Sequence, residues 1–339
     1  MRFKLYALLF CLLLLPSSAL AGGFCCQMPT GVQDAMYGSS SSGGNFQLRT
    51  DYSYSHMHKF VEADHEVRFS SILSDPRFNK NMGVVPNSMD MQRITLSGSY
   101  APTGKVRVMV SVPWVINDMT MQMHNAVMWM APVKMKQISE LGDVTAIGLY
   151  RFYQDREPMP TMAISGGVGL KFPTGSHTVQ ANGKRVHAHM QPGTGSWDPI
   201  LTLNFVDMLN SDFLLQADAT YQIATKNDLG YCAGDTFALN SYLRYNLVDF
   251  INVSLGLGYF HSEQADDPLN NYNGQDSRRL TDFVGYTGED SIWVSPGFQV
   301  LPMKHASVDF KFQYPLYYSV GGIQQVTDYR LLAGVSYSF

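Results

Sequence analysis

Hydrophobic and polar residues alternate one by one along most of this chain. Within 328–339 the odd positions hold Tyr, Leu, Ala, Val, Tyr and Phe, and the even positions are mostly polar or small. The same alternation runs through 213–223 and 105–112. A period of two is that of a β-strand with one apolar face and one polar face. The pattern therefore predicts an all-β protein.

The alternating segments are about 10 to 14 residues long, whereas the strands of soluble sheets usually have about five or six residues. In 142–153 the apolar Ile147 and Leu149 share a phase with Asp143 and Arg151, so the two faces of this segment are less distinct. The predicted strands, about twelve, are 46–57, 89–100, 105–116, 142–153, 160–172, 196–209, 212–225, 235–247, 250–263, 289–301, 305–317 and 327–339.

The connections between these strands alternate in length. An even number of long strands, with short turns on one side and long loops on the other, is typical of a single antiparallel transmembrane β-barrel. A secreted β-sandwich or jelly roll is the alternative, although its strands would be shorter. The expected periplasmic turns are 101–104, 154–158, 210–211, 248–249 and 302–304, and the expected extracellular loops are 59–88, 117–141, 173–195, 226–234, 265–288 and 318–325.

The start of the chain has the features of an export signal. Arg2 and Lys4 precede an apolar run over 5–15, and Ala19-Leu20-Ala21 has the small-x-small form of a cleavage site. The expected organisation is a signal peptide over 1–21, an N-terminal periplasmic or plug segment over 22–45, and a transmembrane β-barrel over 46–339. The expected location is the outer membrane of a Gram-negative bacterium.

The last residues point the same way. Phe339 ends the sequence, with Tyr337 and Val335 two and four positions before it on the predicted lipid face. This ending resembles the C-terminal signal that the bacterial barrel-assembly machinery reads. Outer-membrane lipid and that machinery are therefore the expected partners, together with a small-molecule solute.

Short motifs at turns and strand ends carry a family resemblance. They are Leu141-Gly142-Asp143-Val144-Thr145, Tyr150-Arg151, Gly169-Leu170-Lys171-Phe172-Pro173-Thr174-Gly175 and Gly193-Thr194-Gly195-Ser196. With them the chain resembles the outer-membrane family named for phenol meta-pathway degradation, whose members are called transporters. That family is distantly similar to the long-chain fatty-acid channels. The resemblance implies a barrel in the outer membrane and says little about the solute.

Composition and charge exclude several classes of protein. Aromatic residues make up 12% of the chain and require burial, so disorder is excluded. The net charge is −4 and there is no basic run, so nucleic acid is not an expected partner. The one His-x-Ser pair, His305-Ala306-Ser307, lies by a predicted turn with Ser307 facing the lumen. That is the wrong side for an outer-membrane phospholipase, and neither an enzyme nor a resident cofactor is expected.

The polar face of the predicted strands carries many charges, which would line the lumen. Buried charges persist only when they are paired or hydrated, so the interior is either a water-filled pore or a network of salt bridges. Bases outnumber acids on this face, which would favour anions in an open pore. The candidate permeation residues are Arg49, Asp51, Arg93, Arg107, Arg151, Lys171, Asp198, Asp218, Arg244, Lys311 and Arg330.

Methionine and histidine gather in the predicted loops and at the outer rim. Of the 19 methionines, ten lie between Met82 and Met135. Thioether and imidazole groups suit Cu(I), and imidazole also suits Cu(II) or Zn. Methionine is also a general flexible apolar residue that could pack these loops or contact a hydrophobic solute. The candidate metal ligands are Met89, Met91, Met119, Met121, Met123, His124, His187 and His189.

Three functions are consistent with these patterns. The favoured one is an outer-membrane channel or transporter for passive or gated passage of small molecules, including aromatic or hydrophobic ones. The alternative is a copper-handling outer-membrane protein that uses the Met- and His-rich loops. A structural or adhesive barrel is third, and it would show no permeability.

Overall fold

The protein is described here by a computed structural model. It describes residues 44–80, 82–125, 127–157, 160–181, 183–268, 280 and 284–339. The expected signal peptide and all but two residues of the segment 22–45, with Cys25 and Cys26, lie outside the described residues.

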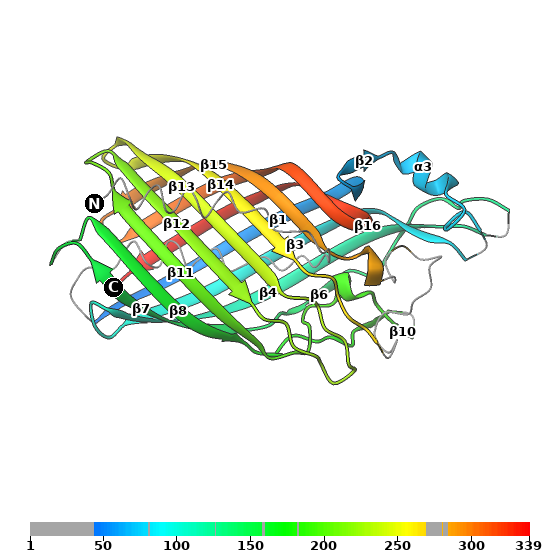
Figure 1. Ribbon diagram of the computed structural model, residues 1–339, viewed down its shortest axis with the longest axis horizontal. Coiled ribbons are helices and arrows are strands. Elements are labelled where there is room, and N and C mark those ends of the chain that lie inside the picture. Colours follow the sequence, from blue (N-terminus) through cyan, green and yellow to red (C-terminus); the bar gives the residue numbers. More distant parts are fainter. Residues whose placement is uncertain are drawn as a thin grey trace.

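In the described part of the chain, eleven long strands form a closed antiparallel β-barrel (Figure 1). Each strand pairs with the next long strand, and the last returns to pair with the first, so the sheet has no open edge. The long strands are β1 (Asn45–Ala63), β3 (Val84–Ala101), β4 (Val106–Met123), β7 (Thr145–Gln154), β8 (Met162–Lys171), β11 (Asp198–Met208), β12 (Phe213–Gln222), β13 (Thr236–Val248), β14 (Ile251–Ser262), β15 (Glu289–Met303) and β16 (Ala306–Ser338).

The longest element, β16, crosses the barrel twice. Its first half pairs with β15, from Met303↔Ala306 to Glu289↔Val320, and its second half pairs with β1, from Ala63↔Val320 to Gln47↔Ser338. The two predicted strands 305–317 and 327–339 are therefore one continuous ribbon that bends at Gly321 and Gly322. The loop expected at 318–325 is wrong, because both sides of this bend are still paired to neighbouring strands.

β1, β3, β4 and β16 also extend beyond their predicted outer ends, because residues there pack into a small core outside the barrel. Phe60, Phe78 and Val85 are buried in this core with Ile72 of the short helix α3 (Phe69–Ser74). No helix in the described residues is long and apolar enough to cross a membrane. The other short elements at this end are β2 (His65–Val67), β5 (Val133–Lys134), β6 (Ile138–Leu141), β9 (Gln180–Ala181), β10 (Lys184–Arg185), η1 (Ala188–Met190) and η2 (Val284–Tyr286).

The barrel is polar inside and apolar outside. In β1, Arg49 and Asp51 are buried while Leu48 and Tyr52 are exposed, and β11 shows the same alternation, with Thr202 and Asn204 inside. A soluble sandwich would bury the apolar residues instead. The predicted transmembrane β-barrel is confirmed, and the sandwich alternative is excluded by this arrangement.

One apolar patch breaks the rule and lies on the inner wall. Ile147 and Leu149 are buried there with Met109 and Ile200. They lean across β8, where a Cβ on Gly167 would come within 2.5 Å of a Leu149 methyl group. The mixed phase noted in the sequence of this strand therefore reflects a real apolar surface inside the lumen.

A charge on the outer face should destabilise the barrel. Leu255 is 57% exposed in the middle of β14, so Leu255→Arg should lower the free energy of unfolding by about 2–4 kcal/mol in lipid. Urea unfolding in vesicles would measure this. Val127→Arg, in a loop and 85% exposed, is the matched control and should leave stability unchanged. Equal stability of wild type and Leu255→Arg would contradict the assigned lipid face.

Candidate functional site

The segment between β8 and β11, residues 172–197, folds into the barrel and is called here the constriction loop. Its described part includes Ala188 and Met190, which are 0% and 1% exposed. The side chain of Asn117, on the inner face of β4, donates a hydrogen bond to the carbonyl of Met190 at 3.3 Å. Asn227 donates to the carbonyl of Thr194 at 2.9 Å. The loop therefore occupies the mouth of the lumen and narrows it.

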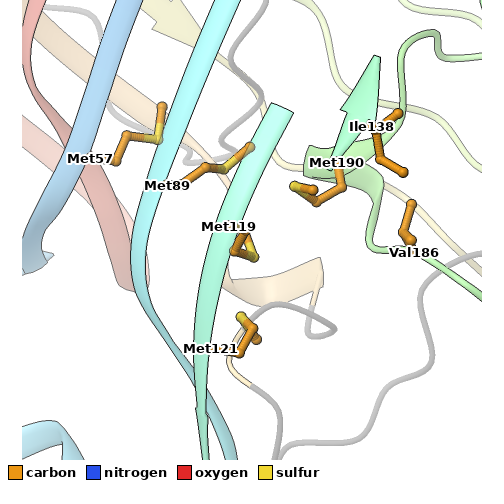
Figure 2. Close-up of a cluster of buried hydrophobic side chains, with 7 residues drawn as sticks. All are labelled: Met57, Met89, Met119, Met121, Ile138, Val186 and Met190. Carbon is orange, nitrogen blue, oxygen red and sulfur yellow. The ribbon is translucent and has the colours of Figure 1, made fainter. Parts of the chain in front are cut away.

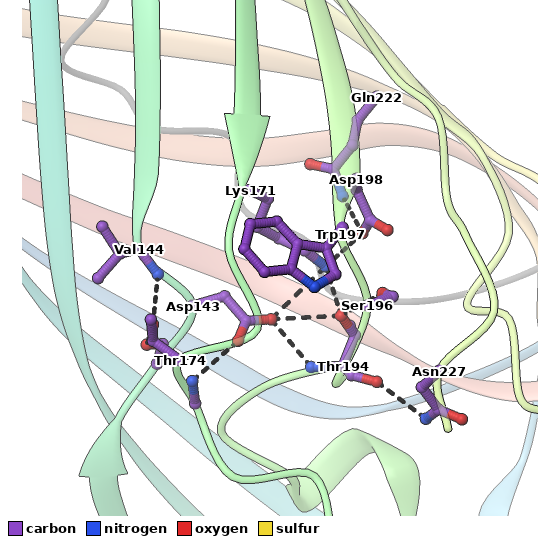
Figure 3. A network of polar contacts seen from close by, with 12 residues as sticks. Asp143, Val144, Lys171, Thr174, Thr194, Ser196, Trp197, Asp198, Gln222 and Asn227 are labelled. Carbon is purple, nitrogen blue, oxygen red and sulfur yellow. Dashed lines mark hydrogen bonds and ion pairs between the residues drawn. The ribbon is translucent and has the colours of Figure 1, made fainter. Parts of the chain in front are cut away.

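One carboxylate holds both ends of the constriction loop (Figure 3). Asp143 lies at the break between β6 and β7. Its Oδ1 accepts the backbone N–H of Gly175 at 3.0 Å, and its Oδ2 accepts the N–H of Thr194 at 2.9 Å. The loop is thereby closed at its neck and fixed to the barrel wall by the same side chain.

Lys171 and Asp198 complete this arrangement. The Lys171 ammonium forms an ion pair with Asp198 and lies 3.5 Å from Oδ2 of Asp143. Asp198 is fully buried and also accepts from Gln222 at 3.1 Å and from the backbone of Thr225 at 2.9 Å. Such a buried carboxylate is tolerated because it is paired with Lys171 and accepts two hydrogen bonds. We call Asp143, Lys171, Thr194 and Asp198 the clasp.

Glycines let the backbone close around the clasp. A Cβ on Gly193 would lie 2.4 Å from Oδ1 of Asp143 and 2.6 Å from the carbonyl oxygen of Gly175. A side chain here would therefore push the two loop ends apart.

Three of the four motifs that carry the family resemblance contribute to this neck, although they are far apart in sequence. The sequence predicted Lys171 and Asp198 as lumen-lining permeation residues, and Asp143 was not among the predicted residues. The motif around Asp143 was the available signal.

The other predicted lumen residues lie on barrel strands, and their environments differ. Arg49 lies between two carboxylates, with its guanidinium 2.7 Å from Asp51 and 2.8 Å from Asp309. This part of the lumen is the salt-bridge network that the sequence left open as one interpretation. Arg107 instead donates from Nη1 to Ser99 at 2.9 Å.

The remaining charges make polar or ring contacts. Arg330 donates to Ser55 at 3.0 Å, and its guanidinium carbon lies 4.9 Å from the centre of the Trp293 ring. Of the eleven candidates, Arg93 and Arg330 are partly buried and the others are buried. Further contacts are Arg244 to Gln299 at 3.1 Å, Lys311 to the Tyr242 ring centre at 4.7 Å, and Asn240 to Asp218 at 3.1 Å.

Methionines from three neighbouring strands form a row inside the outer half of the barrel (Figure 2). Met57 of β1 is paired with Met89 of β3, which is paired with Met119 of β4. All three are less than 5% exposed. Met121 and Met190 join them in the same buried cluster, which also contains Ile138 and Val186.

The eight predicted metal ligands are only partly brought together. Met89, Met119 and Met121 are in the cluster and Met91 packs against it, whereas Met123 is 37% exposed at the end of β4. His124 packs edge-on against Trp129 instead, with ring centres 5.1 Å apart. Among the described residues, no three His, Cys, Asp or Glu side chains are placed to hold a metal.

His187 and His189 lie on the constriction loop around η1. His189 lines a cavity of about 110 Å³ beneath the loop, together with Met91, Arg93, Asn117 and Lys171. Met57 and Met190 belong to the methionine cluster and were missed from the sequence, because cross-strand register decides which methionines meet.

Cys232 lies in the loop after β12 and is a free thiol. Its Sγ contacts the carbonyl of Ala224 at 3.5 Å. Burial raises the pKa of the Cys232 thiol above its usual range, so the reactive thiolate form is disfavoured.

Comparison with known proteins adds a family and a fold. A family model described as "Putative MetA-pathway of phenol degradation" matches residues 69–319. The crystal structure of the COG4313 outer membrane channel from Pseudomonas putida F1 is similar, with a TM-score of 0.56, 14% identity, and coverage of 89% of this chain and 98% of that chain. This likeness shows the fold of an outer-membrane barrel.

Two other solved structures are more distant. A Pseudomonas aeruginosa FadL homologue has a TM-score of 0.38 and 10% identity, covering 90% of this chain and 92% of that chain. The P. putida toluene transporter TodX has a TM-score of 0.42 and 10% identity, covering 94% of this chain and 95% of that chain. No curated protein matches the sequence.

Breaking the clasp should free the constriction loop. Asp143→Ala removes the acceptor shared by both loop ends, so trypsin should cleave after Arg185 faster than in wild type, by about tenfold or more for a loss of 1.4 kcal/mol or greater. Timed proteolysis of the folded barrel in detergent measures this. Asp249→Ala, in an exposed turn, is the control and should be cleaved like wild type. An unchanged cleavage rate in Asp143→Ala would show that other contacts hold the loop.

Proposed function

The chain belongs to the family of the MetA pathway of phenol degradation, and on this basis we propose that it is a channel of the Gram-negative outer membrane for small molecules. The observation that carries the proposal is the construction of the lumen. Polar side chains line the interior of the closed barrel. The constriction loop covers the mouth of this lumen and is hydrogen-bonded to β4. Passage would be passive or gated by the constriction loop.

The solute class follows from the surfaces that a molecule would meet. The outer half of the lumen has a methionine-lined apolar wall, and the inner wall carries the apolar patch of Met109, Ile147, Leu149 and Ile200. The COG4313 protein, whose fold this barrel shares, is an outer membrane channel. We therefore propose that the solutes are small and include aromatic or hydrophobic molecules.

Insertion into the membrane belongs to the same proposal. The Phe339 ring packs against Phe46 in a tilted arrangement and against Tyr337 edge to face, with ring centres 5.6 Å and 4.9 Å apart, at the turn end of the barrel. Recognition of this aromatic end by the barrel-assembly machinery, after export through the signal peptide 1–21, would deliver the chain to the outer membrane.

Conductance in a planar lipid bilayer tests the channel. The wild-type protein should give discrete steps, and Asp143→Asn should raise the mean conductance about twofold or more, because a looser constriction loop widens the narrowest part of the path. Asp249→Asn is the matched control and should conduct like wild type. A folded barrel that stays silent in both wild type and Asp143→Asn would contradict the channel and favour a structural or adhesive role.

Copper handling is a second candidate, favoured by the register of Met57, Met89 and Met119. Side chains directly opposite in adjacent strands have Cβ atoms about 4.5–5.5 Å apart, which places three thioethers within reach of one soft ion. Three thioethers match the preference of Cu(I) for sulfur ligands.

Replacing these three methionines together by leucine should separate metal binding from packing. Leucine conserves volume, so the barrel should remain folded, while the Cu(I) affinity should fall at least about tenfold, a loss of about 1.4 kcal/mol. Competition with a chromogenic Cu(I) chelator under reducing conditions measures the affinity. Met128→Leu with Met130→Leu, both exposed in a loop, is the control. Equal affinity in the triple variant and wild type would leave the cluster as packing alone.

A further inference from the structure

Arg107 is a buried cation with no acidic partner among the described residues. Its side chain is 4% exposed on the inner face of β4. Nη1 donates to the hydroxyl of Ser99 at 2.9 Å, while Nη2 has no hydrogen-bond partner. A buried guanidinium without a counter-charge is costly. Arg49, elsewhere in the same lumen, shows the usual solution, with carboxylates on two sides.

A second arginine lies next to Arg107 rather than an acid. Arg107 is opposite Leu149 in the β4–β7 pair, and the backbone N–H of Arg151 bonds to the carbonyl of Lys105 at 2.7 Å. Arg151 is therefore the diagonal neighbour of Arg107 on the inner face, at a spacing that long side chains can bridge. The two positive charges reinforce each other at this part of the wall.

A buried hydroxyl continues the row on the next strand. Ser165 of β8 is directly opposite Arg151, is 0% exposed, and its Oγ has no hydrogen-bond partner. Buried polar groups are nearly always hydrogen-bonded. The Nη2 of Arg107 and the hydroxyl of Ser165 are thus two unsatisfied donors that flank Arg151.

The wall beside this row is apolar. Leu149, opposite Arg107, packs with Met109, Ile147 and Ile200 in one buried cluster. A ligand that satisfied the donors would therefore touch a hydrocarbon surface with the rest of its body. An inorganic anion would leave that surface without a partner.

We propose that Arg107, Arg151 and Ser165 form a binding site for small organic monocarboxylates inside the lumen. The carboxylate accepts from Nη2 of Arg107 and from Ser165, and the apolar body lies on Met109 and Leu149. The guanidinium fork matches the planar geometry of a carboxylate. The assignment rests on the proposed channel function, and it names the solutes that this channel would hold on the way through.

Benzoate is a suitable probe, because it joins one carboxylate to a rigid apolar ring. Isothermal titration of the full-length protein in detergent should show saturable benzoate binding, weakened at least tenfold by Arg107→Gln. Lys105→Gln removes the same charge from an exposed residue two positions earlier, just before β4 begins, and the affinity of this variant for benzoate should stay within twofold of wild type. Arg107→Lys, which keeps the charge without the fork, should give an intermediate affinity.

Two further ligands test the two halves of the site. Acetate should bind at least tenfold more weakly than benzoate, because it lacks the apolar body. Benzyl alcohol, which lacks the charge, should bind Arg107→Gln and wild type alike. Equal benzoate affinity in wild type and Arg107→Gln, or equal affinity for acetate and benzoate, would overturn the proposal.

Calorimetry measures benzoate binding independently of conductance, so the binding site and the channel function are tested separately. A barrel that binds benzoate through Arg107 but does not conduct would retain the site and refute the channel. A barrel that conducts but shows no saturable benzoate binding would support the channel and refute the binding site. Heat-modifiable migration on a gel confirms that each variant is folded, and Ser165→Ala provides a second, uncharged substitution that should weaken benzoate binding about threefold.

Discussion

The structure depends on closure of the sheet between β1 and β16. Hydrocarbon offers no hydrogen bonds, so every backbone N–H and C=O that crosses the membrane needs a partner within the sheet. β1 meets this requirement by pairing with β16 on one side and β3 on the other. Once the sheet is closed, the alternation of side chains sends the polar face inward. Closure and alternation together are therefore sufficient to produce a lumen lined by charged side chains.

The charged side chains of the lumen are neutralised to different extents along its wall. At the clasp, Lys171 is neutralised by Asp143 and Asp198, and across the barrel Arg49 is neutralised by Asp51 and Asp309. These groups are structural: they fix a loop or hold strands. Arg107 instead has no acidic partner among the described residues, and its diagonal neighbour on the inner face is a second arginine, Arg151. The contrast within one lumen, more than the number of charges, marks where a solute would be held.

The constriction loop links the polar and apolar parts of the mouth. Its neck is held by hydrogen bonds to Asp143, and its residues Val186 and Met190 pack against the methionine row of β1, β3 and β4. Thioether side chains pack without demanding one geometry. Polar contacts therefore fix the neck of the loop, and the rest of its described part is held by thioether packing and by the hydrogen bond from Asn117 to the carbonyl of Met190.

The fold class, most of the strands and their inward faces follow from the amino-acid sequence alone, because strand alternation is a local property with a period of two. Strand 213–222 lies within the predicted 212–225, and nine of the eleven lumen candidates are buried. Which of these residues come into contact depends on the tertiary structure. It brought Asp143 to both ends of a distant loop, added Met57 and Met190 to the methionine cluster, and turned 318–325 into a continuous ribbon. Register and loop folding depend on contacts between residues far apart in the chain, which no local pattern records.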